Sequence, residues 1–170
     1  MSSILFTWEI GQGYGHVMPL LAVARALKSQ GHTVTFALRD VRGIGQTLAG
    51  EGFGVMQAPY HPDRFIKAEE DPPRSMADVL TLFGFGDLRH LQGLQAAWFS
   101  LLSQSRADLV VASYAPLSLL CARALGVLAQ LGQLGGIANG VGAVLVQPQR
   151  DGLEVARKVR QLRPRRARQK

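Results

Sequence analysis

The sequence predicts an α/β fold in which flanking helices cover a parallel sheet and an irregular basic tail follows. Three observations predict it. A strand-like run, a glycine-rich turn, a helical pattern and a second strand-like run follow one another within residues 4–38. Further apolar runs recur later, and clean periodicity stops near residue 127. A strand, a crossover helix and a strand in so short a stretch form a βαβ unit, which starts a parallel sheet.

The first βαβ unit is predicted from simple patterns. The apolar run 4–8 is typical of a buried strand, and the glycine-rich turn 11–15 follows it. Apolar residues then recur at three- and four-residue steps, which indicates a helix that starts near His16. Gly31 ends this helix, and the β-branched run 33–38 predicts the second strand.

The later elements follow from the same patterns. They are, in chain order, a short helix over 41–50, a strand over 54–58, a proline-rich loop over 59–75, a helix around 91–102, a strand over 108–113 and a helix that begins at Pro116. We therefore predict one α/β domain over residues 1–127. A glycine-rich and then basic tail over 128–170 is expected to be poorly ordered.

The net charge of +7 is concentrated at one end of the chain. Residues 1–127 hold ten basic and ten acidic side chains, whereas 128–170 hold nine basic and two acidic ones. A basic domain surface is therefore not indicated, and we expect no nucleic-acid partner for the domain. Three interpretations of the tail stay open: it binds a nucleic acid, it binds a membrane surface, or it is a solvated tail without a ligand.

Several classes of protein are excluded or disfavoured by simple features. No apolar stretch is long enough to cross a bilayer, and the first residues lack the features of a signal peptide. The single cysteine, Cys121, cannot form an internal disulfide and fits a reducing compartment. We therefore expect a cytoplasmic protein. No group of His and Cys has the spacing of metal ligands, so no metal is expected.

The turn that ends at His16 carries the most chemistry. It is not a dinucleotide fingerprint, because His16 stands where the last glycine belongs and no acidic residue ends the second strand. It is not a P-loop either, because Gly-Lys-Ser/Thr is absent. A histidine at a helix start could instead take a proton from a bound hydroxyl, and the positive helix end keeps its ring neutral. The alternative is that His16 only caps the helix.

Three more residues are candidates for the same crevice. Glu9 directly follows the first strand and could bind a hydroxyl of a ligand. Trp8 and Phe85 could line an apolar pocket, although core packing is the usual role of an aromatic side chain.

These residues carry a resemblance to a known family. The segment Gly13-x-Gly15-His16-x-x-Pro19-Leu20-Leu21, together with 24–27, 31–36 and the later 107–116, resembles the UDP-glycosyltransferase-like members of the GT-B superfamily. Those enzymes glycosylate small hydroxylated molecules. The resemblance implies that residues 1–127 are the Rossmann-like, acceptor-binding N-terminal half of a GT-B fold.

The resemblance also implies roles for individual residues. In the family, the histidine that matches His16 is the general base on the acceptor hydroxyl, and Gly13 and Gly15 shape its turn. A hexose then passes with inversion from a nucleotide sugar, which is a co-substrate rather than a cofactor. Where the family has an aspartate that orients the base, this chain has Ser113, which carries no charge to stabilise an imidazolium.

A second departure concerns the donor half of the family's fold. Residues 128–170 do not resemble the C-terminal domain that holds the donor nucleotide, so we expect a truncated chain that is inactive by itself. The tail is either a frameshift product or the end of a natural split protein, whose donor domain is a separate chain. Two function classes stay open: the acceptor domain of a hexosyltransferase, or a non-catalytic small-ligand-binding domain or degenerate fragment.

Overall fold

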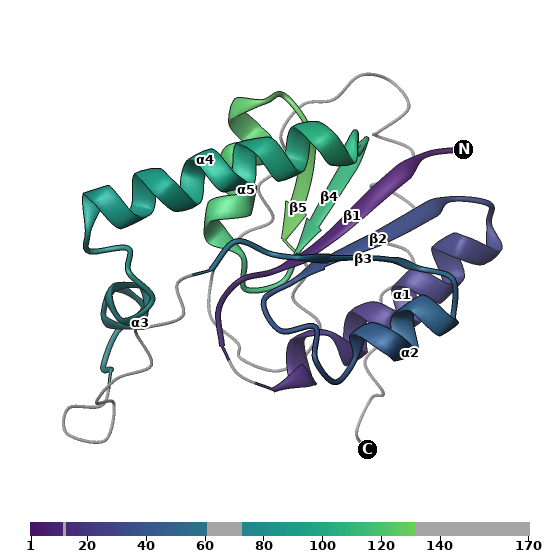
Figure 1. The fold of residues 1–170 in the computed structure, drawn as a ribbon, viewed down its shortest axis with the longest axis horizontal. Helices are drawn as coiled ribbons and strands as arrows, with labels where there is room; N and C mark the ends of the chain where they lie inside the picture. Colours follow the sequence, from purple (N-terminus) through teal and green to yellow (C-terminus); the bar gives the residue numbers. More distant parts are fainter. Residues whose placement is uncertain (12, 61–72, 132–170) are drawn as a thin grey trace, which may run out of the picture.

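A computed structural model describes residues 1–11, 13–60 and 73–131 and shows an α/β domain with one parallel sheet (Figure 1). Its strands are β1 (Ser3–Trp8), β2 (Thr33–Leu38), β3 (Gly54–Gln57), β4 (Leu109–Ala112) and β5 (Leu128–Leu131). Its helices are the 3-10 turn η1 (Tyr14–His16), α1 (Met18–Ser29), α2 (Gly45–Gly50), α3 (Met76–Leu82), α4 (Leu88–Ser105) and α5 (Pro116–Ala124). The predicted fold class is confirmed. No helix in these described ranges is long and apolar enough to cross a membrane.

Helices cover both faces of the sheet because side chains alternate along each strand. In β1, Ile4, Phe6 and Trp8 pack in one buried cluster with residues of α1 and α2. Leu5 points the other way and packs in a second cluster with residues of α4 and α5. Figure 1 shows α4 and α5 on one side of the sheet and α1 and α2 on the other. The domain therefore has three layers with two apolar interfaces.

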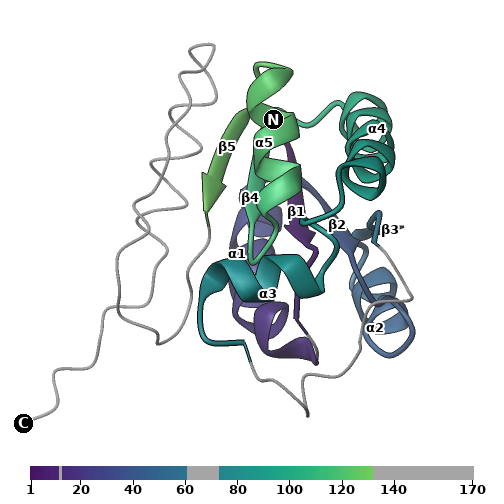
Figure 2. The ribbon, with the colours of Figure 1, turned by 90° about the vertical axis from the view of Figure 1, so that its left-hand side faces the viewer.

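The strand order β3-β2-β1-β4-β5 predicts a ligand site at the carboxyl ends of the central strands β1 and β4. β1 pairs with β2 on one side and with β4 on the other, so the direction in which strands are added reverses between β1 and β4. Open α/β sheets bind their ligands outside the carboxyl ends of the strands at such a reversal. Figure 2 shows α3 lying beyond these carboxyl ends. Residues that directly follow β1 and β4 are thus the first candidates for a site.

The sheet continues past residue 127, where the sequence analysis placed the end of the domain. β5 pairs in parallel with β4 from Leu109↔Leu128 to Ala112↔Leu131, and Ala129 is buried. A four-residue edge strand is too short to leave a readable alternation, which is why the pattern did not indicate it. The remainder of the predicted tail, 132–170, and most of the predicted loop 59–75 lie outside the described residues.

Candidate functional site

The last residue of β1 and the residue that follows it point to opposite faces of the sheet. Trp8 is 1% exposed and lies in the core cluster with α1. Its indole Nε1 donates to the carbonyl oxygen of Ile10 at 2.6 Å. Glu9 points instead toward α5. Trp8 and Glu9 were predicted to contact one ligand, but strand alternation separates them, and Trp8 does not line the pocket described below.

Glu9 caps helix α5 from across the sheet. Its Oε2 accepts a hydrogen bond from the backbone N–H of Leu117 at 2.9 Å, and its Oε1 accepts one from Ser118 at 2.9 Å. The residue at the N-cap position of α5 is Ala115, which has no side-chain oxygen to satisfy these N–H groups. Glu9 therefore has a structural role in joining β1 to α5, besides any role toward a ligand.

Burial raises the pKa of Glu9 to about 8, because the charged carboxylate loses its hydration at this position. The two backbone N–H bonds oppose this shift, since both favour the ionised form. The raised pKa favours the protonated carboxyl at neutral pH.

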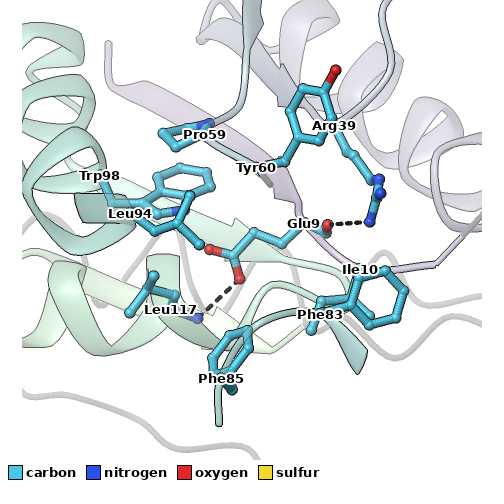
Figure 3. A pocket seen from close by; sticks show the side chains of 10 residues that line it. All are labelled: Glu9, Ile10, Arg39, Pro59, Tyr60, Phe83, Phe85, Leu94, Trp98 and Leu117. Carbon is cyan, nitrogen blue, oxygen red and sulfur yellow. Dashed lines mark hydrogen bonds between the residues drawn. The ribbon is translucent and has the colours of Figure 1, made fainter. Parts of the chain in front are cut away.

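Glu9 lines a pocket of about 310 Å³ that opens to solvent at the carboxyl edge of the sheet (Figure 3). The other described residues that line it are Ile10, Arg39, Pro59, Tyr60, Phe83, Phe85, Leu94, Trp98 and Leu117. Most of these side chains are apolar or aromatic. Phe85, which was predicted as a pocket residue, is among them. An apolar cleft with a few polar groups is the usual form of a small-molecule site.

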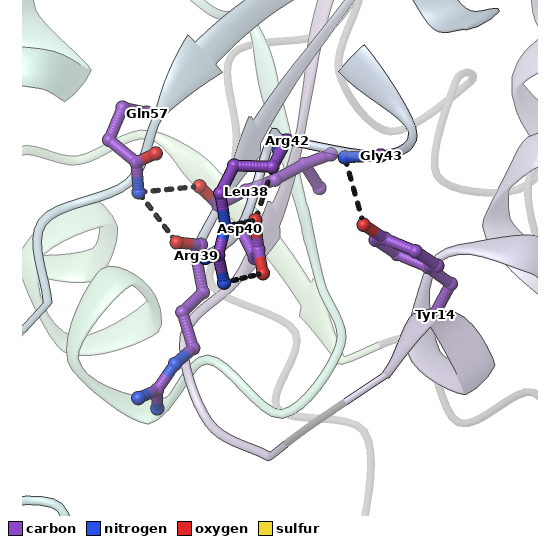
Figure 4. A network of polar contacts seen from close by, with 7 residues as sticks. All are labelled: Tyr14, Leu38, Arg39, Asp40, Arg42, Gly43 and Gln57. Carbon is purple, nitrogen blue, oxygen red and sulfur yellow. Dashed lines mark hydrogen bonds and ion pairs between the residues drawn. The ribbon is translucent and has the colours of Figure 1, made fainter.

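Arg39 enters this pocket from the end of β2. Its backbone N–H donates to the carbonyl oxygen of Trp8 at 3.0 Å, and its own carbonyl oxygen accepts from Gln57 Nε2 at 2.6 Å. Figure 4 shows the second contact beside the exposed ion pair of Arg42 with Asp40, whose charged atoms are 2.8 Å apart. The main chain of Arg39 is therefore held from both neighbouring strands.

His16 ends the 3-10 turn η1, and its ring is held between two aromatic rings. The ring centroid lies 4.9 Å from that of Tyr114 and 6.2 Å from that of Trp8, with interplanar angles of 29° and 27°. Tyr14, at the start of the same turn, accepts a hydrogen bond at its hydroxyl from the N–H of Gly43 (Figure 4). Burial lowers the pKa of His16, so the imidazole is neutral and able to accept a proton at pH 7.

The segment Glu9–Gly11 lies between His16 and the pocket. Glu9 and Ile10 line the pocket, and Gly11 contacts the imidazole: a Cβ added to Gly11 would lie 3.1 Å from His16 Nε2. Gly11 also has a φ of 97°, which favours glycine. His16 itself is not among the described lining residues. One short segment thus borders both the pocket and the histidine.

The two glycines predicted to shape the turn lie away from the imidazole. A Cβ added to Gly13 or to Gly15 would meet no atom within 4 Å. Gly13 has a φ of 70°, so it needs its backbone freedom for the turn itself. Residue 12, between Gly11 and Gly13, lies outside the described residues.

Ser113 follows β4 directly and is 7% exposed. Its N–H donates to the carbonyl oxygen of Thr7 at 2.9 Å, which extends the pairing of β1 with β4. Alternation along β4 puts Ser113 on the Trp8 side of the sheet, the side of His16. Within the described part of the chain, no hydrogen bond joins His16 to Ser113 or to a carboxylate.

Tyr114, the next residue, makes the contact with the imidazole instead. It is not a glycine, yet its φ is 52°. Its carbonyl oxygen accepts hydrogen bonds from the N–H groups of Glu9 and Ile10, at 3.4 and 3.0 Å. This residue therefore fixes both the loop beside the pocket and the ring of His16.

Arg39, Tyr114 and Gly11 were not identified as site residues from the sequence. One feature of the sequence could have indicated Arg39: it directly follows a predicted strand, as Glu9 does. Tyr114 had the same signal after the fourth strand. Gly11 belonged to the recognised turn, but its contact with His16 depends on how the turn folds back. In the described ranges, no three His, Cys, Asp or Glu side chains gather as metal ligands would.

Comparison with solved structures identifies the fold. The chain is similar to MurG of Acinetobacter baumannii, with 22% identity and a TM-score of 0.53 over 76% of this chain and 34% of that one. It is similar to SsfS6, a glycosyltransferase of Streptomyces sp. SF2575 solved with thymidine diphosphate, with 23% identity and a TM-score of 0.51 over 76% and 37%. The spinosyn rhamnosyltransferase SpnG, solved with the spinosyn aglycone, matches with 13% identity and a TM-score of 0.51 over 76% and 33%. No family model and no curated protein sequence matches the chain.

The domain therefore has the Rossmann-like α/β fold of GT-B glycosyltransferases, as the resemblance at Gly13 to His16 implied. The chain spans about a third of the length of these enzymes.

Proposed function

We propose that this domain binds the small hydroxylated acceptor of a glycosyltransferase and that His16 is the base that activates the acceptor. One observation carries the proposal: Glu9 and Ile10 line a mostly apolar pocket at the carboxyl ends of the strands, and the next residue, Gly11, lies against a neutral, ring-stacked histidine. A pocket of this kind suits an apolar molecule, and the histidine suits removal of a hydroxyl proton.

The proposed reaction is transfer of a hexose from a nucleotide sugar with inversion. The acceptor oxygen attacks the anomeric carbon while its proton passes to the imidazole of His16. The bond between the anomeric carbon and the nucleotide diphosphate breaks, and the diphosphate leaves with the electron pair. The donor would be held by a domain beyond the described residues. The thymidine diphosphate bound to SsfS6 and the aglycone bound to SpnG support a nucleotide donor and an apolar acceptor here.

A second candidate is a non-catalytic domain that binds the same kind of ligand. The surroundings of His16 favour it, because no described carboxylate bonds the imidazole and Ser113 replaces the aspartate of the family pattern. A protonated His16 would then lack the opposite charge that stabilises it. Both candidates share the pocket and differ only in whether transfer follows binding.

The test is incubation of the full chain, together with a separately supplied donor domain of a GT-B glycosyltransferase, with UDP-glucose and a panel of phenols, with products detected by mass spectrometry. We expect His16→Ala to lower the rate by about 10²–10⁴, the usual contribution of a general base. His32→Ala is the control, because His32 lies outside the pocket and its Nδ1 accepts the N–H of Ser2 at the start of the sheet. Turnover that survives His16→Ala would contradict the assigned base. Phenol binding without turnover would favour the non-catalytic domain.

A further inference from the structure

Arg39 is held in place within the wall of the pocket. Its main chain is bonded to Trp8 of β1 and to Gln57 of β3, as described above. The residue is 6% exposed, and its Nη1 donates to the carbonyl oxygen of Glu9 at 3.4 Å. Both the main chain and the guanidinium of Arg39 are therefore bonded to other parts of the domain.

Two aromatic rings from separate parts of the chain lie against this guanidinium. Its central carbon is 5.4 Å from the ring centroid of Tyr60, which comes shortly after β3, and 5.0 Å from that of Phe83, which directly follows α3. Figure 3 shows the three side chains next to one another in the pocket wall. A cation is attracted to the face of an aromatic ring at this range, and a planar guanidinium also packs against rings. Arg39 thus connects Tyr60 and Phe83 to the end of β2.

The helix before Phe83 has no buried side chain of its own. It begins with a capping box of Ser75 and Asp78 and lies beyond the carboxyl ends of the strands (Figure 2). Helices in proteins are stabilised mainly by packing of an apolar face, and α3 buries too little for this to fix its place. Phe83 at its end and Phe85 just beyond it both line the pocket. The position of this part of the wall therefore depends on contacts such as the one between Phe83 and Arg39.

We propose that Arg39 is a positioning residue of the acceptor pocket, which holds the rings of Tyr60 and Phe83 in place and so strengthens binding of an aromatic acceptor that packs against them. The inference rests on the proposed function, since it concerns how the same pocket binds its acceptor. Arg39 acts through the two rings and need not bond the acceptor itself. Side chains that are ordered before binding lose less conformational entropy when a ligand arrives. A neutral acceptor should therefore depend on Arg39.

The test measures the affinity of the full chain for 4-hydroxybenzamide, a neutral phenol, by calorimetry at pH 7. We expect Arg39→Gln to weaken binding by about five- to tenfold, because two rings must then be ordered when the ligand binds. Arg39→Lys keeps the charge but not the planar group, so an intermediate loss is expected, and this variant serves if Arg39→Gln does not fold. Arg42→Gln is the matched control, because Arg42 is exposed outside the pocket and pairs with Asp40; it should leave the affinity unchanged.

Hydrogen exchange at the backbone amide of Phe83 separates this role from direct contact with the ligand. This amide donates to the carbonyl oxygens of Val79 and Leu80 at the end of α3. We expect it to exchange faster in ligand-free Arg39→Gln than in the native chain and Arg42→Gln, because the end of α3 has lost a contact.

Two results would overturn the inference and leave the proposed acceptor pocket standing. One is an Arg39→Gln chain that binds the amide as tightly as the native chain does. The other is weaker binding with unchanged exchange at Phe83, which would indicate that Arg39 contacts the ligand directly. Failure of the native chain to bind any phenol of the panel would overturn both proposals.

Discussion

The rings of His16 and Tyr114 stack with their centroids 4.9 Å apart, and this contact joins the start of α1 to the end of β4. Tyr114 also accepts hydrogen bonds from Glu9 and Ile10 at its carbonyl oxygen. The imidazole is therefore positioned by an aromatic ring and by burial. The family pattern instead has a charged side chain close to this place, at the position of Ser113.

Removal of the Tyr114 ring should raise the pKa of His16. Burial lowers this pKa, and Tyr114→Ala exposes the imidazole, so its pKa should return toward the ordinary value of about 6.5. Tyr114→Phe keeps the stacked ring and should leave the pKa as it is in the native chain. An NMR titration of the imidazole signals measures both. The same His16 pKa in the Ala and Phe variants would show that Tyr114 does not set it.

A charge placed at Ser113 should also raise the pKa of His16. Ser113 lies on the His16 side of the sheet, and a nearby carboxylate favours the imidazolium. Ser113→Asp is therefore expected to give a higher His16 pKa than Ser113→Asn, which has similar size and no charge. The same NMR titration checks this difference. Equal values would mean that the side chain at this position does not reach the base.

Substitution by alanine should lower the free energy of unfolding more at Gly11 than at Gly15. Gly11→Ala is strained at its φ of 97° and its Cβ approaches His16 Nε2, so we expect a loss of about 1–3 kcal/mol in the free energy of unfolding. Gly15→Ala meets no atom within 4 Å and has no positive φ, so its effect should stay within about 0.5 kcal/mol. Urea unfolding compares the two. Similar losses at both positions would disprove the close approach at Gly11.

Glu9 should make the protein less stable as the pH rises. Between pH 4.5 and about 8 the folded chain keeps the Glu9 proton and the unfolded chain releases it. The free energy of unfolding therefore falls with pH, by up to about 1.4 kcal/mol per pH unit from this group. Glu9→Gln removes this dependence, so the variant should gain stability relative to the native chain from pH 5 to pH 9. Chemical unfolding at a series of pH values measures the difference.

Glu51→Gln provides the matched control for this series. Hydrogen bonds from Arg25 lower the pKa of Glu51, so any contribution from this pair is lost only as the pH falls below the ordinary range of a glutamate. The difference between this variant and the native chain should be constant from pH 5 to pH 9. A constant difference for Glu9→Gln as well would mean that Glu9 is ionised throughout this range.

The local patterns were enough to predict β1, α1 and β2, because each is a periodic run with a clear boundary such as Gly31. Glu9 was expected at the crevice because it directly follows a parallel strand, and in the structure Glu9 and Phe85 line the same pocket. Trp8 was placed in the same crevice, but successive residues of a strand point to opposite faces, and Trp8 packs in the core.

The other parts of the site depend on contacts between distant segments. The stacking of Tyr114 on His16 and the entry of Arg39 into the pocket both require the pairing of β1 with β4 and β2. No local pattern encodes that pairing. The sequence around Ala115 does not indicate that Glu9 caps α5. Its only hint is that Ala115, at the N-cap position, has no side-chain oxygen to accept the first N–H groups of the helix.

The most direct test of the account is the position of a bound phenol relative to His16. A crystal structure of the full chain with 4-hydroxybenzoate should show the ring in the pocket beside Glu9 and the hydroxyl oxygen within about 2.6–3.2 Å of an imidazole nitrogen, the reach of a general base. A phenol that binds elsewhere, or whose hydroxyl group is directed away from His16, would contradict the central claim that this pocket and this histidine form one acceptor site.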